Sequence, residues 1–411
     1  MIKVVQLQYS TASGGSSALR LQKAFLKAGI ESSIISLQAD RVRDDKITYL
    51  GFRSKLIGRI DAKLQSFLTL PKLKDSGSFS FPILGTNVAW MEQVKDADYI
   101  YLHWILNGFL SLKSIESLAK LNKPIIVFMH DMWPITGGCH YSLTCEKYTI
   151  GCDECPMFIK QTKNDFSKKE FKNKLKFYSK YSNLFFVSPS TWLYDCAKQA
   201  LLTKDKPVFY IPNILDNTVF KALDKKKAKE ILNIDTEETV IAFGAVSIDS
   251  SRKGWAYLQK ALEILHAKKE FKNVLVLIFG SGNNSKMAAA IPFKVKFMGY
   301  LKDEYSKVLV YNAADVFIVP SLADNQPTTV QESLSCGTPV VGFKIGGIPD
   351  MIRHKENGYL AAYQDSEDIA EGIKFCCKEN LKGYMLSSFQ PGATIQKHLN
   401  LFEYTKTQMN K

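Results

Sequence analysis

The sequence lacks several features that would assign it to a membrane or nucleic-acid class. No run of 18 or more apolar residues occurs, so no membrane-spanning helix is predicted. The opening MIKVVQLQYS lacks the apolar core and cleavage site of a secretory signal, so we expect a cytoplasmic protein. Helix-turn-helix, RNA-binding and C2H2 zinc-finger signatures are also missing, and we therefore expect no nucleic-acid partner.

Positive charge, in contrast, is abundant and unevenly distributed. Residues 1–212 carry 29 Lys and Arg against 18 Asp and Glu, a net +11, whereas the rest carries 25 against 22, a net +3. A surface of one sign attracts oppositely charged partners over about a Debye length, roughly 8 Å. The first half is thus predicted to meet an anionic membrane surface or an anionic substrate.

The chain is too long for one hydrophobic core, and its pattern indicates two. A length of 411 residues exceeds what single cores reach. Near-continuous apolar runs predict strands at 4–9, 33–36, 98–104, 124–131 and 184–190, and then at 239–246, 273–282, 295–300, 314–321, 339–343 and 357–362. Helical patterns separate them, as at 16–29 and 255–269. Such alternation is typical of parallel sheets covered on both faces.

We therefore predict an α/β protein of two doubly wound, Rossmann-like domains. The first spans 1–200 and the second 201–390, with a linker near 196–212. A final helix, 391–411, follows Pro391 and Gly392 and is able to return to the first domain. Ligands of such folds bind at the carboxyl ends of the strands, so we expect a ligand cleft between the domains.

Two loops have the composition of anion-binding sites. Gly14 and Gly15 follow the first predicted strand and allow backbone N–H groups to approach an anion, although they lack the G-x-G-x-x-G spacing. Arg252 and Lys253 stand before a predicted helix, where cations oppose the helix dipole. Together they suit a diphosphate. Alternatively, Gly14 and Gly15 only form a tight turn between strand and helix, and Arg252 and Lys253 are only a solvated pair of surface charges.

The stretch SLADNQPTTVQESLSCGTPVVGFKIGGIPD, residues 321–350, is the most informative. Asp324 or Asn325 is placed to cap a helix whose first turn holds Pro327, Thr328 and Thr329. Glu332 lies on the same helix, where burial demands a partner such as a sugar hydroxyl. Alternatively, Asp324 is only a cap and Glu332 only a surface acid.

These segments together resemble the retaining nucleotide-sugar glycosyltransferases of family 4, which have the GT-B fold. The resemblance rests on the Gly-Gly loop, IPNILDNTVF, FGAVSIDSSRKG, FGSG, FMGYL, the acid-x7-acid helix and GTPVVGFKIGGIPDMI with NGYL. It implies transfer from a nucleotide-diphosphate sugar to a glycan or lipid-linked acceptor, in surface polysaccharide or glycolipid biosynthesis. It also implies retention of configuration and no metal or other cofactor in catalysis.

The resemblance also implies roles for individual residues. Arg252 and Lys253 would hold the diphosphate, Glu332 the ribose, and Asp324 and His130 the donor sugar. The wider nucleotide-sugar site would include Gly14, Gly15, Gly280, Asn325, Thr328 and Thr329. Two positions depart from the family. Asp324 is one methylene shorter than the usual Glu, and Ser247 stands where the diphosphate Arg is common, six residues before Lys253.

Four of the eight cysteines cluster within 17 residues. Cys139, Cys145, Cys152 and Cys155 read C-x5-C-x6-C-x2-C, and four thiolates can close a tetrahedral structural zinc site. Free thiols or a redox-labile pair are the alternatives. We expect the cluster to shape the acceptor side and to take no part in catalysis.

The segment 160–180 carries eight Lys against Asp165 and Glu170. Its aromatic and leucine side chains form an imperfect apolar stripe. The helix either lies on an anionic membrane that carries a lipid-linked acceptor, which would place the protein at the inner face of the membrane, or packs on the core with a solvated Lys face.

A catalytically silent binding subunit of an assembly complex remains the alternative to an enzyme.

Overall fold

The computed structural model describes residues 1–11, 17–38, 44–69, 78–248, 250–281 and 289–409. Two compact units divide the chain. One comprises residues 1–213 and 394–411, and the other residues 214–393. No helix within these described ranges is both long and apolar enough to cross a membrane.

The first unit is built on a seven-stranded parallel sheet of order β3-β2-β1-β4-β5-β6-β7. Its strands are β1 (Lys3–Ser10), β2 (Glu31–Gln38), β3 (Ile47–Tyr49), β4 (Tyr99–Leu102), β5 (Ile125–Phe128), β6 (Leu184–Ser188) and β7 (Val208–Tyr210). The order reverses direction at β1 and β4, which is where open α/β sheets place their ligands.

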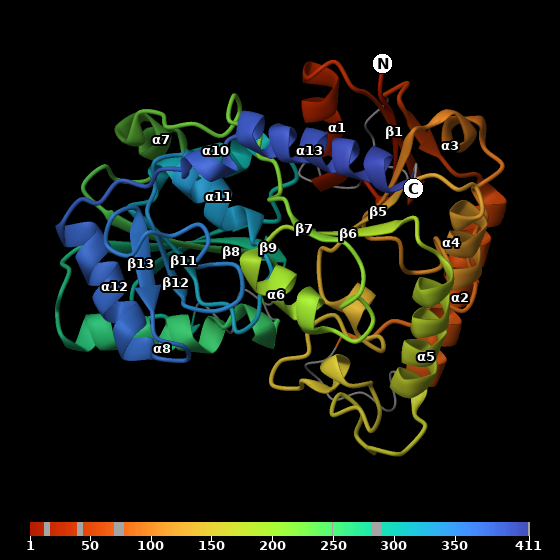
Figure 1. Ribbon diagram of the computed structural model, residues 1–411. Helices are drawn as coiled ribbons and strands as arrows, with labels where there is room; N and C mark the ends of the chain where they lie inside the picture. The colour runs from red at the N-terminus through yellow and green to blue at the C-terminus, as the bar shows by residue number, and fades with distance from the viewer. Residues whose placement is uncertain (12–16, 39–43, 70–77, 249, 282–288, 410–411) are drawn as a thin grey trace. The chain divides into compact units, whose positions relative to one another are not determined.

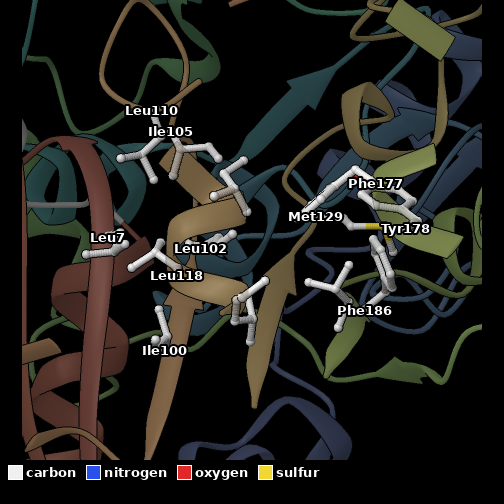
Figure 2. Close-up of a cluster of buried hydrophobic side chains, with 14 of the residues drawn as sticks. Leu7, Ile100, Leu102, Ile105, Leu110, Leu118, Met129, Phe177, Tyr178 and Phe186 are labelled. Carbon is white, nitrogen blue, oxygen red and sulfur yellow. The ribbon is translucent and has the colours of Figure 1, made fainter. Parts of the chain in front are cut away.

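Helices cover both faces of this sheet. They are α1 (Ser17–Lys27), α2 (Phe52–Thr69), α3 (Glu92–Asp96), α4 (Leu112–Ala119), α5 (Phe166–Lys180) and α6 (Thr191–Gln199). Leu7, Ile100 and Leu102 of the strands pack with Leu118 of α4 and with Phe177 of α5 in one core cluster (Figure 2). Since apolar side chains from successive strands meet those of the helices, the near-continuous apolar runs are buried.

Helix α13 (Pro391–Met409) completes the first unit although it follows the second in sequence. The Tyr99 hydroxyl donates to the Phe402 carbonyl at 3.1 Å, and their rings stack at 4.1 Å. The Tyr101 hydroxyl lies 2.9 Å from His398 Nδ1. Phe25 of α1 also contacts His398, so α13 lies beside α1 in this unit (Figure 1).

The second unit has a six-stranded parallel sheet of order β10-β9-β8-β11-β12-β13. Its strands are β8 (Thr239–Ser247), β9 (Val274–Ser281), β10 (Lys294–Gly299), β11 (Val316–Val319), β12 (Val340–Phe343) and β13 (Gly358–Ala361). Along β8, Val240 and Ala242 join one core cluster while Ile241 and Phe243 join another. The first cluster includes side chains of α7 (Lys225–Ile231), α10 (Glu304–Ala313) and α11 (Thr328–Ser335), and the second those of α8 (Trp255–Ala267) and α12 (Ser366–Lys378).

The prediction of two doubly wound α/β domains is therefore confirmed. The predicted linker region, 196–212, differs from the structure. It contains the end of α6 and the strand β7, which pairs with β6 through Phe186 and Val208. Strands β3 and β7 have only three residues each, too few for a hydrophobic period to reveal them.

Candidate functional site

In the second unit, the loop after β8 is tied to the loop after β11. The Leu322 N–H donates to the Arg252 carbonyl at 2.8 Å, and Arg252 Nη1 donates to the Ala323 carbonyl at 2.6 Å. Gly254 has φ +72°, and a Cβ there would lie 1.7 Å from the Pro320 carbonyl oxygen. Only glycine permits this approach. These contacts fix the backbone that carries Arg252 and Lys253.

An ion pair joins the two loops through their side chains. Lys253 Nζ lies 2.6 Å from Asp324 Oδ2, Arg252 Nη1 lies 3.5 Å from the same oxygen, and Ser321 Oγ donates to it at 3.2 Å. Burial by itself would raise the pKa of Asp324. The positive charges of Lys253 and Arg252 outweigh that effect, so the pKa of Asp324 lies below its usual value. Asp324 is therefore a buried carboxylate held charged by two cations.

A third loop supports the backbone of Asp324. The Gly347 N–H donates to the Asp324 carbonyl at 3.2 Å. A Cβ at Gly346, which has φ +57°, would lie 1.9 Å from that carbonyl oxygen. The GGIPD segment thus packs directly against the acidic loop, and this approach requires glycine at position 346.

Helix α11 begins later than predicted. Pro327 is its N-cap residue and no side chain caps it, which corrects the prediction of an Asp324 or Asn325 cap. Asp324 is instead engaged by Lys253. Thr328 and Thr329 open the first turn and are partly exposed, and Asn325 is buried just before them.

Glu332 is buried on α11 and has a partner inside the protein. The Tyr311 hydroxyl of α10 donates to Glu332 Oε2 at 2.9 Å, and the Glu332 side chain is almost fully buried. Glu332 is thus no surface acid, and a sugar hydroxyl is not required to satisfy this oxygen. The second carboxylate of the acid-x7-acid pattern is therefore held in place by a tyrosine.

In the first unit, His130 follows β5 and is held by a second histidine. His103 Nδ1 lies 3.0 Å from His130 Nε2, and the two rings stack at 5.3 Å. The Gln6 amide, turned so that its nitrogen donates to His103 Nε2 at 2.8 Å, also accepts from Ser32 Oγ at 3.0 Å. His103 then carries its proton on Nδ1 and donates to His130, which leaves the His130 proton on Nδ1.

Both histidines are neutral at ordinary pH. Burial lowers the pKa of His130 to about 4, although Asp131 opposes the shift. Burial also lowers the pKa of His103 well below its usual value. Asp131 itself faces His140, whose Nδ1 lies 2.6 Å from Asp131 Oδ2. This network therefore orients hydrogen-bond donors without carrying charge on His130.

The remaining predicted nucleotide-sugar residues are partly placed. Gly280 is the second-to-last residue of β9, at the carboxyl end of that strand. Gly14 and Gly15 lie outside the described residues, so their predicted ligand contact stays a prediction.

The four clustered cysteines line one small cavity of the first unit, together with Gly137 and Tyr148. The Gly137 N–H donates to Cys152 Sγ at 3.2 Å. Burial raises the pKa of Cys152 to about 12 and that of Cys155 to about 11. Across the described ranges, no group of three or more His, Cys, Asp or Glu side chains is arranged to hold a metal ion. The side chains as they lie do not form the predicted zinc site, and zinc stays a prediction.

The basic segment 160–180 proves to be a core helix over its helical part. In α5, Phe171, Phe177 and Tyr178 are buried in the first unit's core. Lys174 is also buried, and its Nζ donates to the carbonyls of Trp133 and Thr136. These contacts favour the alternative of a core-packed helix, and Lys169, Lys172 and Lys176 form its solvated face.

Sequence reasoning missed the residues that hold the predicted ones in place. His103, Tyr311 and Ser321 each support a predicted side chain. A signal existed for His103, since it is the second-to-last residue of the predicted strand DYIYLHW, just as His130 is of PIIVFMHD. Tyr311 carried no such signal, because a tyrosine in an apolar helix is ordinarily core.

Comparisons with known proteins agree with this architecture. Residues 237–379 match the family model described as "Glycosyl transferases group 1". A D-inositol 3-phosphate glycosyltransferase of Mycobacterium sp. strain KMS is 32% identical over 171 residues, which are 39% of this chain and 37% of the relative. The chain thus matches little more than a third of that relative's length.

Solved structures extend the likeness over the whole chain. An Anabaena HepE structure in complex with UDP and glucose has a TM-score of 0.60 at 14% identity and covers 98% of this chain and 100% of its own. Staphylococcus aureus TarM, in complex with fondaparinux, alpha-GlcNAc-glycerol and UDP, has a TM-score of 0.61 at 14% identity, with the same coverage. The protein therefore has the GT-B fold. The family match lies within its second unit and covers most of it.

Proposed function

We propose that the protein is a retaining, metal-independent glycosyltransferase of family 4. It moves a sugar from a nucleotide-diphosphate sugar to a glycan or lipid-linked acceptor in surface polysaccharide or glycolipid biosynthesis. The observation that carries the proposal is the Lys253–Asp324 pair on two loops that are tied together at the ends of β8 and β11.

Lys253 and Arg252 would bind the donor diphosphate. A lysine ammonium has three N–H donors, and Asp324 Oδ2 takes one of them. The side chains of Arg252 and Lys253 are 29% and 23% exposed, so both are accessible to a phosphate. As the sugar–oxygen bond breaks, negative charge grows on the leaving diphosphate, and these fixed cations would stabilise it.

Asp324 and Glu332 would hold the donor's hydroxyl groups. Asp324 remains ionised beside Lys253 and accepts hydrogen bonds strongly, which suits a sugar hydroxyl. Glu332, fixed by Tyr311, would accept from the ribose. The remaining proposed contacts to the nucleotide sugar come from Asn325, Thr328, Thr329, Gly280, Gly14 and Gly15.

His130 would donate a hydrogen bond from Nδ1 to the donor sugar. Its proton position follows from the His103 and Gln6 contacts, and its low pKa keeps the ring neutral. A neutral donor can bind a hydroxyl oxygen without repelling the positive charge that develops on the sugar ring in the transition state. Same-face transfer would use the donor phosphate to accept the acceptor's proton.

The experiment is a ligand panel followed by a transfer assay in excess EDTA. A nucleotide diphosphate that binds the folded protein should raise its melting temperature. The matching sugar nucleotide should then turn over without metal, and NMR of the product should show the donor's anomeric configuration. Binding without any turnover would instead identify a catalytically silent subunit. A metal requirement restored by Mg²⁺ or Mn²⁺, or an inverted product, would overturn the mechanism.

A further inference from the structure

Helix α2 presents its large apolar side chains outward. Phe52, Leu56, Ile60 and Leu64 recur at intervals of four, and Phe67 follows three later, which places all five along one side of the helix. Their exposed fractions are 73%, 44%, 43%, 38% and 80% respectively. A contiguous apolar surface of this kind on a folded unit marks an interaction site.

The opposite side of α2 is polar and holds the helix to its unit. Buried Asp61 accepts the N–H groups of Ile83 and Leu84 at 2.9 and 2.8 Å. Buried Gln65 accepts the Phe81 N–H at 3.1 Å. Turning the apolar side inward would break these bonds and leave buried donors unpaired. Ile83 and Leu84, which these bonds hold to the polar side of the helix, are 42% and 36% exposed.

Positive charge accompanies the apolar side chains. Arg53, Arg59 and Lys63 are exposed and Lys55 is partly exposed, whereas the only acid of the helix, Asp61, is buried. Within the described part of the chain, none of these four cations has an ion-pair partner. The accessible surface of α2 is therefore apolar and cationic without a compensating acid.

We propose that this apolar and cationic face of α2 docks on an anionic lipid bilayer. Apolar side chains enter the boundary between headgroups and acyl chains, while Arg and Lys bind lipid phosphates, as in helices that lie in the plane of a membrane. A second copy of the chain fits less well, because a two-fold interface would bring the four cations of each copy together. Lipid phosphates supply the opposite charge that this face lacks.

Helix α5 provides an internal control. It is also rich in lysine, but its large aromatic side chains Phe171, Phe177 and Tyr178 are buried in the core. Lys169, Lys172 and Lys176 are exposed. If net charge alone attracted the protein to membranes, α5 would contribute as much as α2.

The inference rests on the proposed function only in giving the protein a reason to meet a membrane. Its test measures binding without donor or acceptor. A protein that transfers sugar but ignores vesicles would overturn this inference alone, and vesicle binding without nucleotide binding would leave this inference standing while the proposed function fails.

The experiment is sedimentation of the full chain with phosphatidylcholine vesicles, with and without about 30% phosphatidylglycerol. Three variants are compared with the wild type. They are Leu56→Gln/Ile60→Gln/Phe67→Gln on the apolar side, Arg53→Gln/Arg59→Gln/Lys63→Gln on the charged flanks, and the control Lys169→Gln/Lys172→Gln/Lys176→Gln on α5. Glutamine keeps the helix propensity, and unchanged thermal unfolding verifies the fold.

We expect wild-type binding to anionic vesicles only. The charge variant of α2 should bind on the order of a hundredfold more weakly, since each cation near an anionic surface is worth roughly fivefold. The apolar variant should lose binding, and the α5 control should stay within about tenfold of wild type. Equal losses in the α2 and α5 charge variants would overturn the proposal, as would an apolar variant that binds normally. A wild-type dimer in light scattering that the apolar variant dissolves would assign the face to self-association instead.

Discussion

Each unit has a cluster of buried polar side chains near its strand ends, and the two clusters differ in charge. In the first unit, His103 and His130 are neutral because burial lowers their pKa and no strong counter-charge compensates. In the second, Asp324 is also buried but stays charged because Lys253 and Arg252 lie within 2.6 and 3.5 Å of its carboxylate. Desolvation acts on both clusters, and the presence of a partner decides which protonation state survives.

The largest effect should come from Lys253→Ala, which breaks the charged cluster. It removes a diphosphate ligand and leaves Asp324 with Arg252 alone, so we expect transfer to fall by about 10² to 10³-fold. Steady-state kinetics would measure this. Lys260→Ala is the matched control, because Lys260 lies on α8 and, within the part of the chain that the structure describes, its one ion-pair partner is Glu263. Near wild-type transfer by Lys253→Ala would remove the residue from the machinery.

Glu332→Gln tests whether the second carboxylate is needed for its charge. The glutamine oxygen can still accept from Tyr311, so the fold should hold while the bond to the ribose loses its charge. We expect donor affinity to fall about 10- to 100-fold, as for a charge-assisted hydrogen bond of roughly 1.5 to 3 kcal/mol. Calorimetric titration with the nucleotide would measure it. Tyr311→Phe is the control, and should weaken binding less because the carboxylate remains.

The neutral cluster should respond to loss of orientation. His103→Leu removes the donor that fixes the His130 ring, and we expect about a tenfold loss in kcat/KM. His103→Gln should recover most of it, because an amide N–H can donate to His130 Nε2. A purely structural role for His103 would instead show in unfolding experiments for both variants, with no rescue of kcat/KM by glutamine.

The neutral cluster also predicts a dependence of stability on pH. The pKa of His130 is about 4 in the folded protein and near 6.5 when unfolded. Between these values the unfolded chain binds the proton, so stability is fully present above pH 6.5 and falls as the pH drops toward 4. Urea unfolding at pH 7 and 4.5 should show wild type losing about 2 kcal/mol more than His130→Gln. An equal loss would mean that the histidine is protonated in the folded state.

The last prediction concerns the buried thiols, a second neutral cluster that bears on stability and transfer least. Burial raises the pKa of Cys155 to about 11 and that of Cys152 to about 12. From the thiolate fractions, alkylation at pH 8 should be on the order of 10²-fold slower for Cys155 and 10³-fold slower for Cys152 than for a free cysteine. Mass spectrometry after timed iodoacetamide treatment would measure it, with elemental analysis alongside. About one zinc per chain, with alkylation accelerated by a chelator, would instead establish the metal site that the cysteine spacing predicts.

How far the sequence predicts the structure depends on the range of the interactions involved. Apolar runs such as PIIVFMHD identify strands because a strand buried on both faces consists of consecutive apolar residues, and these are visible in the sequence itself. The partners of Asp324 and Glu332 were not predictable, since Lys253 and Tyr311 reach them from other elements. Position 324 was expected to cap a helix, but the nearby cation competes for its carboxylate. Similarly, the apolar side of α2 faces outward because Asp61 on its other side binds the N–H groups of Ile83 and Leu84. The hydrophobic pattern of the sequence does not reveal these hydrogen bonds.

The return of α13 sets an order of events during synthesis. Tyr99 and Tyr101 lie early in the chain, yet their partners Phe402 and His398 are translated after the whole of the second unit, residues 214–393. At ordinary elongation speeds, those residues take roughly 10 to 40 seconds to emerge. During that interval the second unit can fold beside a first unit whose tyrosine surface is bare. A nascent chain stalled before residue 394 should thus attract chaperones at the first unit, the earliest part made and the last completed.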